Sequence, residues 1–258
     1  MIEVADSNVV YYYHFDALGS VVALSDSSGD TIQTYEYSVY GQVAVEDANH
    51  PNPYMFAGLV GFNSGGSIAT SYSTGVVRGD YDIGGLVGEN RYGGIATSYS
   101  SGSVTGRRYV GGLVGYNDGG DISQCISTGT VNGSESHIGG LIGHTLVGTI
   151  SRCYSAGSVN GGSIGVGGLV GTIDSYESFR GGLTMPDISD CFWDVETSGQ
   201  TTSAGGTGKT TAEMQTAATF LDAGWDFVGE TANGTEDIWW ILEGKDYPRL
   251  WWELIPEN

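Results

Sequence analysis

The stretch Gly58-Leu59-Val60-Gly61 opens a pattern that returns four more times in this chain of 258 residues. Successive copies are 27, 27, 28 and 28 residues apart. A fixed period of this length is typical of repeat architectures, in which each unit buries its apolar side chains only by stacking on its neighbours. The later copies are Gly85-Leu86-Val87-Gly88, Gly112-Leu113-Val114-Gly115, Gly140-Leu141-Ile142-Gly143 and Gly168-Leu169-Val170-Gly171.

Two further blocks recur at the same period. Each block is short, contains β-branched or aromatic residues and is bounded by Gly, Ser or Asn, which indicates three short strands per repeat. No helical period fits between the glycines. We therefore predict an all-β fold, a parallel β-solenoid of about five coils of 27–28 residues over residues 58–199. The second blocks are 68–72, 95–99, 122–126, 150–154 and 188–192, and the third blocks contain Val77, Val104, Val131 and Val159.

The abundance of glycine fits tight corners between these strands. The chain has 44 Gly residues without a collagen triplet, and glycine turns a chain at positive φ, where a Cβ would clash. Parallel strands of successive coils lie about 4.8 Å apart, so five coils predict a rod of about 24 Å.

Stacking in register predicts columns of equivalent side chains. One polar column places Asn63, Asn90 and Asn117 where their amides can bond to one another or to corner backbone groups. An aromatic column has two interpretations: an outward row that binds a sugar face or a partner, or packing against the neighbouring rung, which we favour. Its members are Tyr72, Tyr99, Ile126, Tyr154 and Phe192.

The three cysteines share one repeat position. Cys125, Cys153 and Cys191 stand where the first two coils have Ser71 and Ser98. A disulfide between Cys125 and Cys153 is sterically allowed, because rungs about 4.8 Å apart fall within the Cα range of disulfides. A buried ladder of thiols is the alternative, and the small flanking residues favour it. We expect no metal site, because no further His or Cys ligands stand at a suitable spacing.

The repeated blocks resemble the GLUG-motif repeat family of large bacterial surface and secreted proteins. The resemblance covers roughly residues 58–200, and all five copies are recognisable. It implies a β-solenoid passenger or stalk on adhesin-like or protease-bearing polypeptides, whose catalytic domains lie outside the repeats. We therefore expect a non-catalytic extracellular or cell-surface module with a structural or adhesive role and no cofactor.

Residues 1–57 resemble a different family, the Rhs or YD-repeat proteins. The resemblance rests on Tyr11-Tyr12-Tyr13-His14-Phe15-Asp16-Ala17-Leu18-Gly19-Ser20, on Tyr35-Glu36-Tyr37-Ser38-Val39-Tyr40-Gly41 and on Asn52-Pro53-Tyr54-Met55-Phe56-Ala57-Gly58. In that family such segments build a β-shell around a toxin and end in a self-cleaving core motif. That motif is missing here, so toxin release does not carry over. Apolar runs on both sides of 26–30 predict a β-hairpin that covers the open edge of the first coil.

Residues 200–258 predict a C-terminal cap. Residues 200–209 are rich in Thr, Ser and Gly and indicate a loop, and 210–213 fits a capping box before one short helix at about 211–222. The remaining segment is rich in Trp and would fold over the last coil, since a solenoid needs a terminal cap. An exposed Trp platform for carbohydrate is the alternative. The tryptophans are Trp225, Trp239, Trp240, Trp251 and Trp252.

Charge excludes several partners. The formal net charge is −21 and the pI is about 4.1, which argues against nucleic acid or an anionic membrane, because phosphate binding needs Lys and Arg. No apolar run reaches the length of roughly 18 residues that a membrane span requires. The N-terminus lacks the pattern of a secretory signal, so we expect Met1 to start a fragment or a misplaced gene boundary.

No catalytic constellation emerges from the sequence. Residues 205–210 resemble a phosphate loop, but the glycine spacing before Lys209 is wrong. We interpret the acidic cluster Asp187, Asp190, Asp194 and Glu196 as a solvated face rather than as paired carboxylates for glycoside hydrolysis or a Ca²⁺ site. The four histidines, His14, His50, His137 and His144, show no nucleophile-and-base arrangement.

Alternative functions stay open. The chain could assemble into fibres by end-to-end stacking of solenoids, or act as a polysaccharide-binding or polysaccharide-degrading β-helix. Ice binding ranks low, because the column Thr70, Thr97, Gln124, Arg152 and Asp190 loses its threonines after two coils. The expected partner is a surface glycan, a protein or another copy of the chain.

Overall fold

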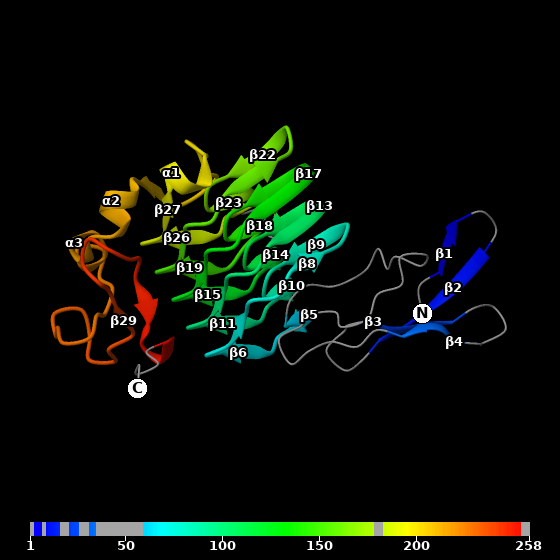
Figure 1. Ribbon diagram of the computed structural model, residues 1–258, viewed down its shortest axis with the longest axis horizontal. Coiled ribbons are helices and arrows are strands. Elements are labelled where there is room, and N and C mark those ends of the chain that lie inside the picture. Colours follow the sequence, from blue (N-terminus) through cyan, green and yellow to red (C-terminus); the bar gives the residue numbers. More distant parts are fainter. Residues whose placement is uncertain are drawn as a thin grey trace.

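The computed structural model describes residues 59–177 and 183–253, together with the backbone of four strands nearer the N-terminus. The larger part is a parallel β-solenoid whose strands are stacked like rungs (Figure 1). The predicted fold class is therefore confirmed. In the described part of the chain, short helices occur only after β27 (Phe192–Asp194), the last strand of the repeats.

Two sheets contain the first block and the first half of the second block of each repeat. All of their strands pair in parallel with the equivalent strands of the neighbouring coils. The first sheet consists of β5 (Val60–Ser64), β10 (Val87–Arg91), β14 (Val114–Asp118), β18 (Ile142–Thr145) and β23 (Val170–Ile173). The second consists of β6 (Ser67–Ala69), β11 (Gly94–Ala96), β15 (Asp121–Ser123), β19 (Thr149–Ser151) and β26 (Asp187–Ser189).

Two more sheets complete the coil. The third consists of β7 (Tyr72–Ser73), β12 (Tyr99–Ser100), β16 (Ile126–Ser127), β20 (Tyr154–Ser155), β27 (Phe192–Asp194) and β28 (Thr207–Lys209). The fourth consists of β8 (Val77–Arg78), β13 (Val104–Gly111), β17 (Val131–Gly139) and β21 (Val159–Gly161), with β9 (Tyr81–Gly84) paired to β13 and β22 (Ile164–Gly167) paired to β17.

The prediction of three strands per coil is wrong, because the second block bends in its middle. The bend falls on a residue other than glycine with φ between 48° and 54°, so the block splits into a strand of the second sheet and a strand of the third. These corner residues form the column considered for ice binding: Thr70, Thr97, Gln124, Arg152 and Asp190.

The stack has about four complete turns rather than five. The fourth sheet has one rung fewer than the first, because the chain does not return to it after β27. Instead it enters the short helix α1 (Val195–Ser198), which Asp194 caps by accepting hydrogen bonds from the backbone of Glu196 and Thr197. The fifth coil is also interrupted by the antiparallel pair β24 (Tyr176–Glu177) and β25 (Leu183–Thr184).

The solenoid interior is packed with aliphatic side chains. Leu86, Leu113, Leu141 and Leu169 of successive Gly-Leu-Val/Ile-Gly blocks are fully buried in one core cluster. The glycines of this block leave room for the next rung: a Cβ on Gly112 would lie 2.2 Å from the carbonyl oxygen of Gly140. A side chain there is excluded by backbone, which cannot move without breaking the stack.

The predicted loop at 200–209 is partly a strand, and it closes the top of the stack. Part of this segment forms β28, which pairs in parallel with β27. Ser203 adds a side-chain contact, because its hydroxyl accepts hydrogen bonds from the backbone of Leu169 and Val170 at 3.2 and 2.9 Å. These residues satisfy backbone groups of the last coil that would otherwise form an open strand edge.

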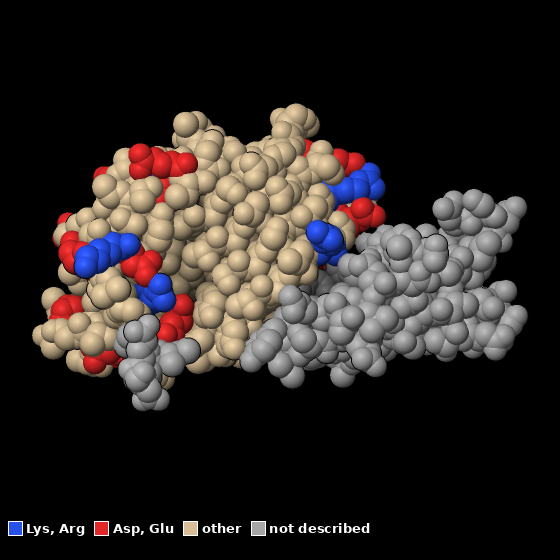
Figure 2. All heavy atoms as spheres, in the orientation of Figure 1, with Lys and Arg blue, Asp and Glu red and all other residues tan. Residues whose placement is uncertain are grey.

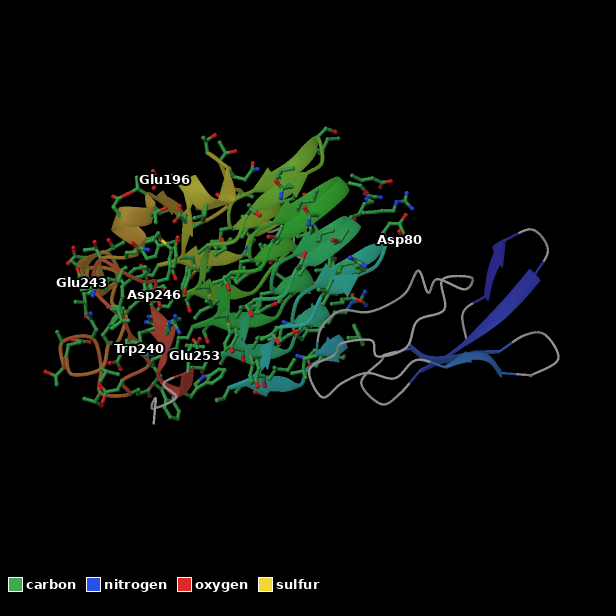
Figure 3. The ribbon with its side chains drawn as sticks, viewed as in Figure 1. Asp80, Glu196, Trp240, Glu243, Asp246 and Glu253 are labelled. Carbon is green, nitrogen blue, oxygen red and sulfur yellow. The ribbon has the colours of Figure 1, made fainter. Side chains whose placement is uncertain are left out.

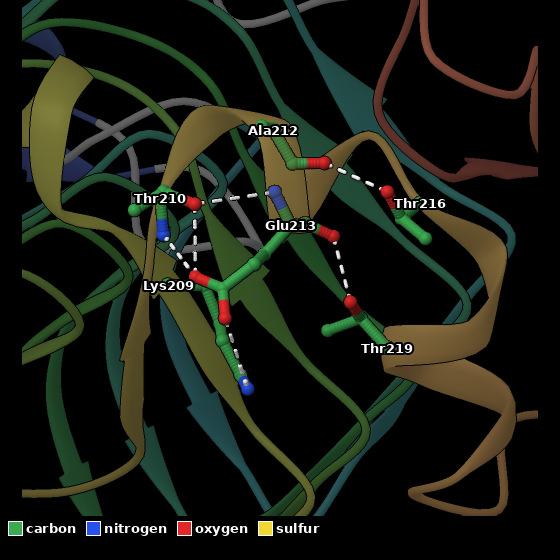
Figure 4. Close-up of polar contacts among 6 residues, drawn as sticks. All are labelled: Lys209, Thr210, Ala212, Glu213, Thr216 and Thr219. Atoms are coloured by element: carbon green, nitrogen blue, oxygen red, sulfur yellow. Dashed lines mark hydrogen bonds and ion pairs between the residues drawn. The ribbon is translucent and has the colours of Figure 1, made fainter.

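The predicted helix at 211–222 is two short helices, α2 (Thr211–Met214) and α3 (Ala217–Leu221), with a break after Gln215. The predicted capping box is present: Thr210 and Glu213 exchange side-chain and backbone hydrogen bonds (Figure 4). The hydroxyl of Thr219 donates to the carbonyl oxygen of Glu213 at 2.8 Å. This contact holds α3 against the end of α2.

The Trp-rich segment does not fold over the last coil as predicted. It lies along the side of the third sheet, where its apolar residues form one core cluster with Ile126, Tyr154 and Phe192. It contains the antiparallel pair β29 (Trp239–Trp240) and β30 (Arg249–Leu250), followed by the 3-10 turn η1 (Trp251–Glu253). We refer to residues 210–253 as the side cap.

Four antiparallel strands precede the solenoid: β1 (Glu3–Asp6), β2 (Val9–Phe15), β3 (Val21–Ser25) and β4 (Thr31–Thr34). Strands β3 and β4 flank the predicted turn at 26–30. That turn, His50, the motif at 52–58 and the predicted cover of the first coil lie outside the described residues.

Candidate binding cleft

The aromatic column of the repeats points away from the solenoid interior and meets the side cap. At its upper end Tyr154 and Phe192 are buried, with 2% and 7% of their surfaces exposed. At its lower end Tyr72 and Tyr99 are only half-buried. The column therefore points outward, as the interpretation of a ligand-binding row required. However, the cap covers most of it.

Two tryptophans of the cap are structural. Trp225 and Trp239 are fully buried and their rings lie 4.4 Å apart. The indole nitrogen of Trp225 donates to the carbonyl oxygen of Asp190 at 3.0 Å, and the hydroxyl of Tyr154 donates to that of Pro248 at 2.7 Å. Trp239, one of the candidate binding aromatics, is therefore inaccessible to a ligand, and Tyr154 keeps only 2% of its surface exposed.

The lower edge of the cap is fastened by a cluster of three rings. The ring centroid of Tyr99 lies 5.3 Å from that of Tyr72 and 5.4 Å from that of Trp252, and the last two lie 6.0 Å apart, so the three rings form a triangular cluster. The indole nitrogen of Trp252 donates to the carbonyl oxygen of Thr97 at 3.1 Å. This cluster connects the side cap to the first and second coils.

A cleft of about 400 Å³ remains between the third sheet and the cap. The charged side chains around it belong to the cap, and Figure 3 labels two of them, Asp246 and Glu253. The solenoid contributes rings, aliphatic groups and hydroxyls. The lining residues are Tyr99, Ser101, Ile126, Thr128, Tyr154 and Ala156 from the solenoid, and Asp246, Tyr247, Arg249 and Glu253 from the cap.

The charged groups of the cleft are held in place. The Arg249 guanidinium donates to Asp246 from Nε at 3.0 Å and lies 5.7 Å from the ring centroid of Trp240. Glu253 accepts a hydrogen bond from the Leu250 backbone at 2.8 Å, and burial raises the pKa of this carboxyl. Burial, with the neighbouring Asp194, raises the pKa of Tyr247 to about 12. The cleft thus offers fixed donors and acceptors beside apolar surface.

The remaining candidate tryptophans differ in exposure. Trp251 has 49% of its surface exposed, whereas Trp240 and Trp252 are half-buried. None of the three lines the cleft directly. No flat platform of exposed tryptophans is present in the described residues.

The asparagine column forms a buried ladder. Asn63 donates to the side-chain oxygen of Asn90, which donates to that of Asn117, both at 2.8 Å. Each amide also donates to a corner carbonyl three residues later, at Gly66, Gly93 and Gly120. The ladder satisfies backbone groups inside the stack and leaves no amide for a ligand.

The three cysteines are buried free thiols in one column. Burial raises the pKa of the Cys153 thiol, and a hydrogen bond with Cys153 together with burial raises that of Cys191. The backbone nitrogens of Cys125 and Cys153 each point to the sulfur of the next rung at 3.4 Å. In the structure the column is the thiol ladder, one of the two arrangements that the sequence allowed.

The acidic cluster does not form a site. Asp194 is fully buried and accepts hydrogen bonds from the hydroxyls of Thr211 and Tyr247, both at 2.7 Å. Asp190 is a corner residue, and Glu196 accepts from the Thr211 backbone. The carboxylates of Asp194 and Glu196 hold the cap to the last coil. Residues 205–210, the rejected phosphate loop, contain β28 and the N-cap residue of α2.

A cluster of four rings was missed by the sequence reasoning. His137 and His144 lie 5.1 Å apart and contact Tyr109 and Tyr116, with Tyr109 stacked on His137 at 4.8 Å. His137 contacts the hydroxyl of Thr172 and His144 the carboxylate of Asp174, at 2.9 and 3.0 Å. Each histidine stands 28 residues after one of the tyrosines, so the repeat period itself carried the signal. Among the described residues, no group of three His, Cys, Asp or Glu is arranged to hold a metal ion.

Comparison with known proteins agrees with the repeat. A family model described as the GLUG motif matches residues 106–132, which include the third Gly-Leu-Val-Gly block. This chain contains a GLUG motif. No solved structure matches the chain.

Several curated proteins match shorter stretches. A protein of Evansella cellulosilytica, named as a Gly-rich membrane protein, is 38% identical over 68 residues, 26% of this chain and 7% of its own length. The tRNA3(Ser)-specific nuclease WapA of Bacillus spizizenii is 41% identical over 51 residues, and the tRNA nuclease WapA of Bacillus subtilis is 37% identical over 51. Each of these two matches covers 19% of this chain and 2% of the nuclease. The chain therefore spans less than a tenth of these relatives.

The GLUG motif and the Gly-rich membrane protein fit a structural repeat module of a surface protein. No helix within the described residues is both long and apolar enough to cross a bilayer.

Proposed function

We propose that the chain is a non-catalytic, extracellular module that holds a binding surface away from the cell and contributes to adhesion. The observation that carries this is the in-register stack: equivalent residues of successive coils pair directly, as in Asn63, Asn90 and Asn117. Such a stack is rigid along its axis, since each coil is fixed by hydrogen bonds to both neighbours.

The surface supports a binding rather than a catalytic role. Figure 2 shows charged side chains gathered at the two sides of the view, with a broad uncharged solenoid surface between them. The acids that the sequence brings closest together cap helices and join the cap to the solenoid, as Asp194 does. The nuclease activity in two relatives' names is not proposed for this chain, because the net charge of −21 opposes RNA binding.

We assign the Rhs/YD-like resemblance of residues 1–57 to the same surface role, as the remnant of a neighbouring shell domain. The four antiparallel strands between residues 3 and 34 support this, because a β-shell is built from such strands.

Two experiments test the proposal. Antibodies against residues 59–253 should label intact cells that carry the protein, and external protease should remove the signal; label that appears only after lysis would contradict it. Small-angle X-ray scattering with light scattering should show a monodisperse particle of about 27 kDa. Growth into rods would favour fibre assembly. The observation that supports this alternative is the outer edge of β5, which pairs with no other described strand.

A further inference from the structure

The cleft beside the side cap has the composition of a small-molecule site. Its volume of about 400 Å³ falls in the range of roughly 300–1,000 Å³ typical of such sites. Ile126 and Tyr154 supply apolar surface and are almost fully buried, whereas Ser101 and Thr128 expose hydroxyls. Rings next to fixed polar groups match a ligand that is apolar on one face and hydroxylated at its edges.

The charged side chains that line the cleft restrict the class of ligand that it can bind. Arg249, the only cation among the described residues that line the cleft, is already paired with Asp246, and Glu253 adds a second carboxylate. A phosphate or sulfate would be repelled by this excess of negative charge. The second oxygen of Glu253 makes no hydrogen bond within the described residues, so it can accept from a hydroxyl.

We infer that this cleft binds a short neutral glycan, with a sugar ring packed against Tyr99 and its hydroxyls bonded to Glu253 and Arg249. The inference rests on the proposed surface role and adds the site and the ligand class. Aromatic side chains suit this task because they present large apolar faces at low cost in conformational entropy.

The repeat supplies a matched test of the site. Thr74 and Thr128 occupy the same exposed position two coils apart, but only Thr128 lines the cleft. Thr128→Trp fills the cleft and removes only one of its polar groups, the Thr128 hydroxyl. Thr74→Trp makes the same change outside it.

The full chain is titrated by calorimetry with cellohexaose, chitohexaose and mannohexaose, and with hexalysine as a cationic control. We expect at least one hexasaccharide to bind, Thr128→Trp to weaken that binding at least tenfold, and Thr74→Trp to change it less than twofold. Circular dichroism checks that both variants fold, and Ser101→Trp is a second variant that fills the cleft if Thr128→Trp does not fold. Glu253→Gln, which retains the shape of the side chain, should weaken binding about fivefold.

Three results would overturn the inference: no hexasaccharide binds to the wild-type chain, the variants that fill the cleft bind as well as the wild type, or only hexalysine binds. None of them affects the labelling of intact cells, so the surface role can survive the loss of this site. Conversely, sugar binding by a protein that is found only inside cells would reject the surface role and keep the site.

Discussion

The repeats at 59–199 and the side cap at 210–253 fill their cores in different ways. Within the solenoid, one small set of side chains is used again on each rung, as with Leu86, Leu113 and Leu141. In the cap each large ring is used once, and Trp225 contacts Phe220, Trp239 and Phe192. A repeat therefore tolerates little change in size at any rung, whereas the cap depends on a few anchors. The cleft lies where these two kinds of packing meet.

The largest expected effect is at the anchor of the cap. Trp225→Ala should lower the free energy of unfolding by about 3–5 kcal/mol, because it empties a fully buried ring position. Trp251→Ala, at a half-exposed ring, should cost less than about 1 kcal/mol. Urea unfolding followed by Trp fluorescence measures both. Equal effects would show that Trp225 does not anchor the cap.

A glycine of the repeat tests the solenoid in the same way. Gly112→Ala should cost about 3 kcal/mol, because its Cβ would lie 2.0 Å from the Ser127 hydroxyl and 2.2 Å from the Gly140 carbonyl oxygen. Gly94→Ala meets nothing within 4 Å and should be nearly neutral. Thermal melting compares the two variants. If Gly112→Ala were tolerated like Gly94→Ala, the rungs would not be stacked this closely.

The asparagine ladder gives a smaller effect. Asn90→Ala should cost about 2 kcal/mol, because it leaves the buried amides of Asn63 and Asn117 without their shared partner. Asn160→Ala removes an exposed bond to Asn132 and should cost less than about 0.5 kcal/mol. The midpoints of urea unfolding, measured at one pH, compare the loss of stability in the two variants. A small loss for Asn90→Ala would mean that water replaces the ladder.

A pH effect follows from Asp82 of β9. Burial, with Glu89 nearby, raises its pKa from 3.8 to about 6. The pKa of Asp82 is higher in the folded chain than in the unfolded chain, so protonated Asp82 stabilises the fold. This stabilisation is complete below about pH 3.8 and is lost as the pH rises through about 6. Wild type should lose about 1 kcal/mol more than Asp82→Asn between pH 5 and pH 7.5. Asp80→Asn, a change nearby in the chain, should follow the wild type; parallel curves for wild type and Asp82→Asn would contradict the assignment.

The smallest effect concerns the thiols. Because Cys125, Cys153 and Cys191 are buried, the native chain should react slowly with a thiol reagent, and the chain unfolded without reductant should show three thiols. Only one thiol in the unfolded, unreduced chain would mean that two of the cysteines form a disulfide.

The period alone predicted the solenoid and the register of its columns. It did not predict the corner within the second block, because Thr70 and Arg152 adopt positive φ there, a conformation that is normally expected only at glycine. The neighbouring rungs hold this corner by stacking, which no local pattern encodes.

The position of the cap was not predictable in the same way. A Trp-rich tail signals burial, but where it packs depends on the outward face of the Tyr154 column, which the sequence left open. The cleft was missed for the same reason: Glu253 and Thr128 are 125 residues apart and meet only through the folded cap.

The in-register stack is the central claim, and disulfide trapping of exposed residues tests it most directly. Asn132 and Asn160 face each other on neighbouring rungs, so the double variant Asn132→Cys with Asn160→Cys should form a disulfide under mild oxidation. Asn132→Cys with Ser158→Cys is two residues out of register and should not. Mass spectrometry of the oxidised peptides distinguishes them. Equal trapping of both pairs, or trapping of the second pair alone, would contradict the solenoid register.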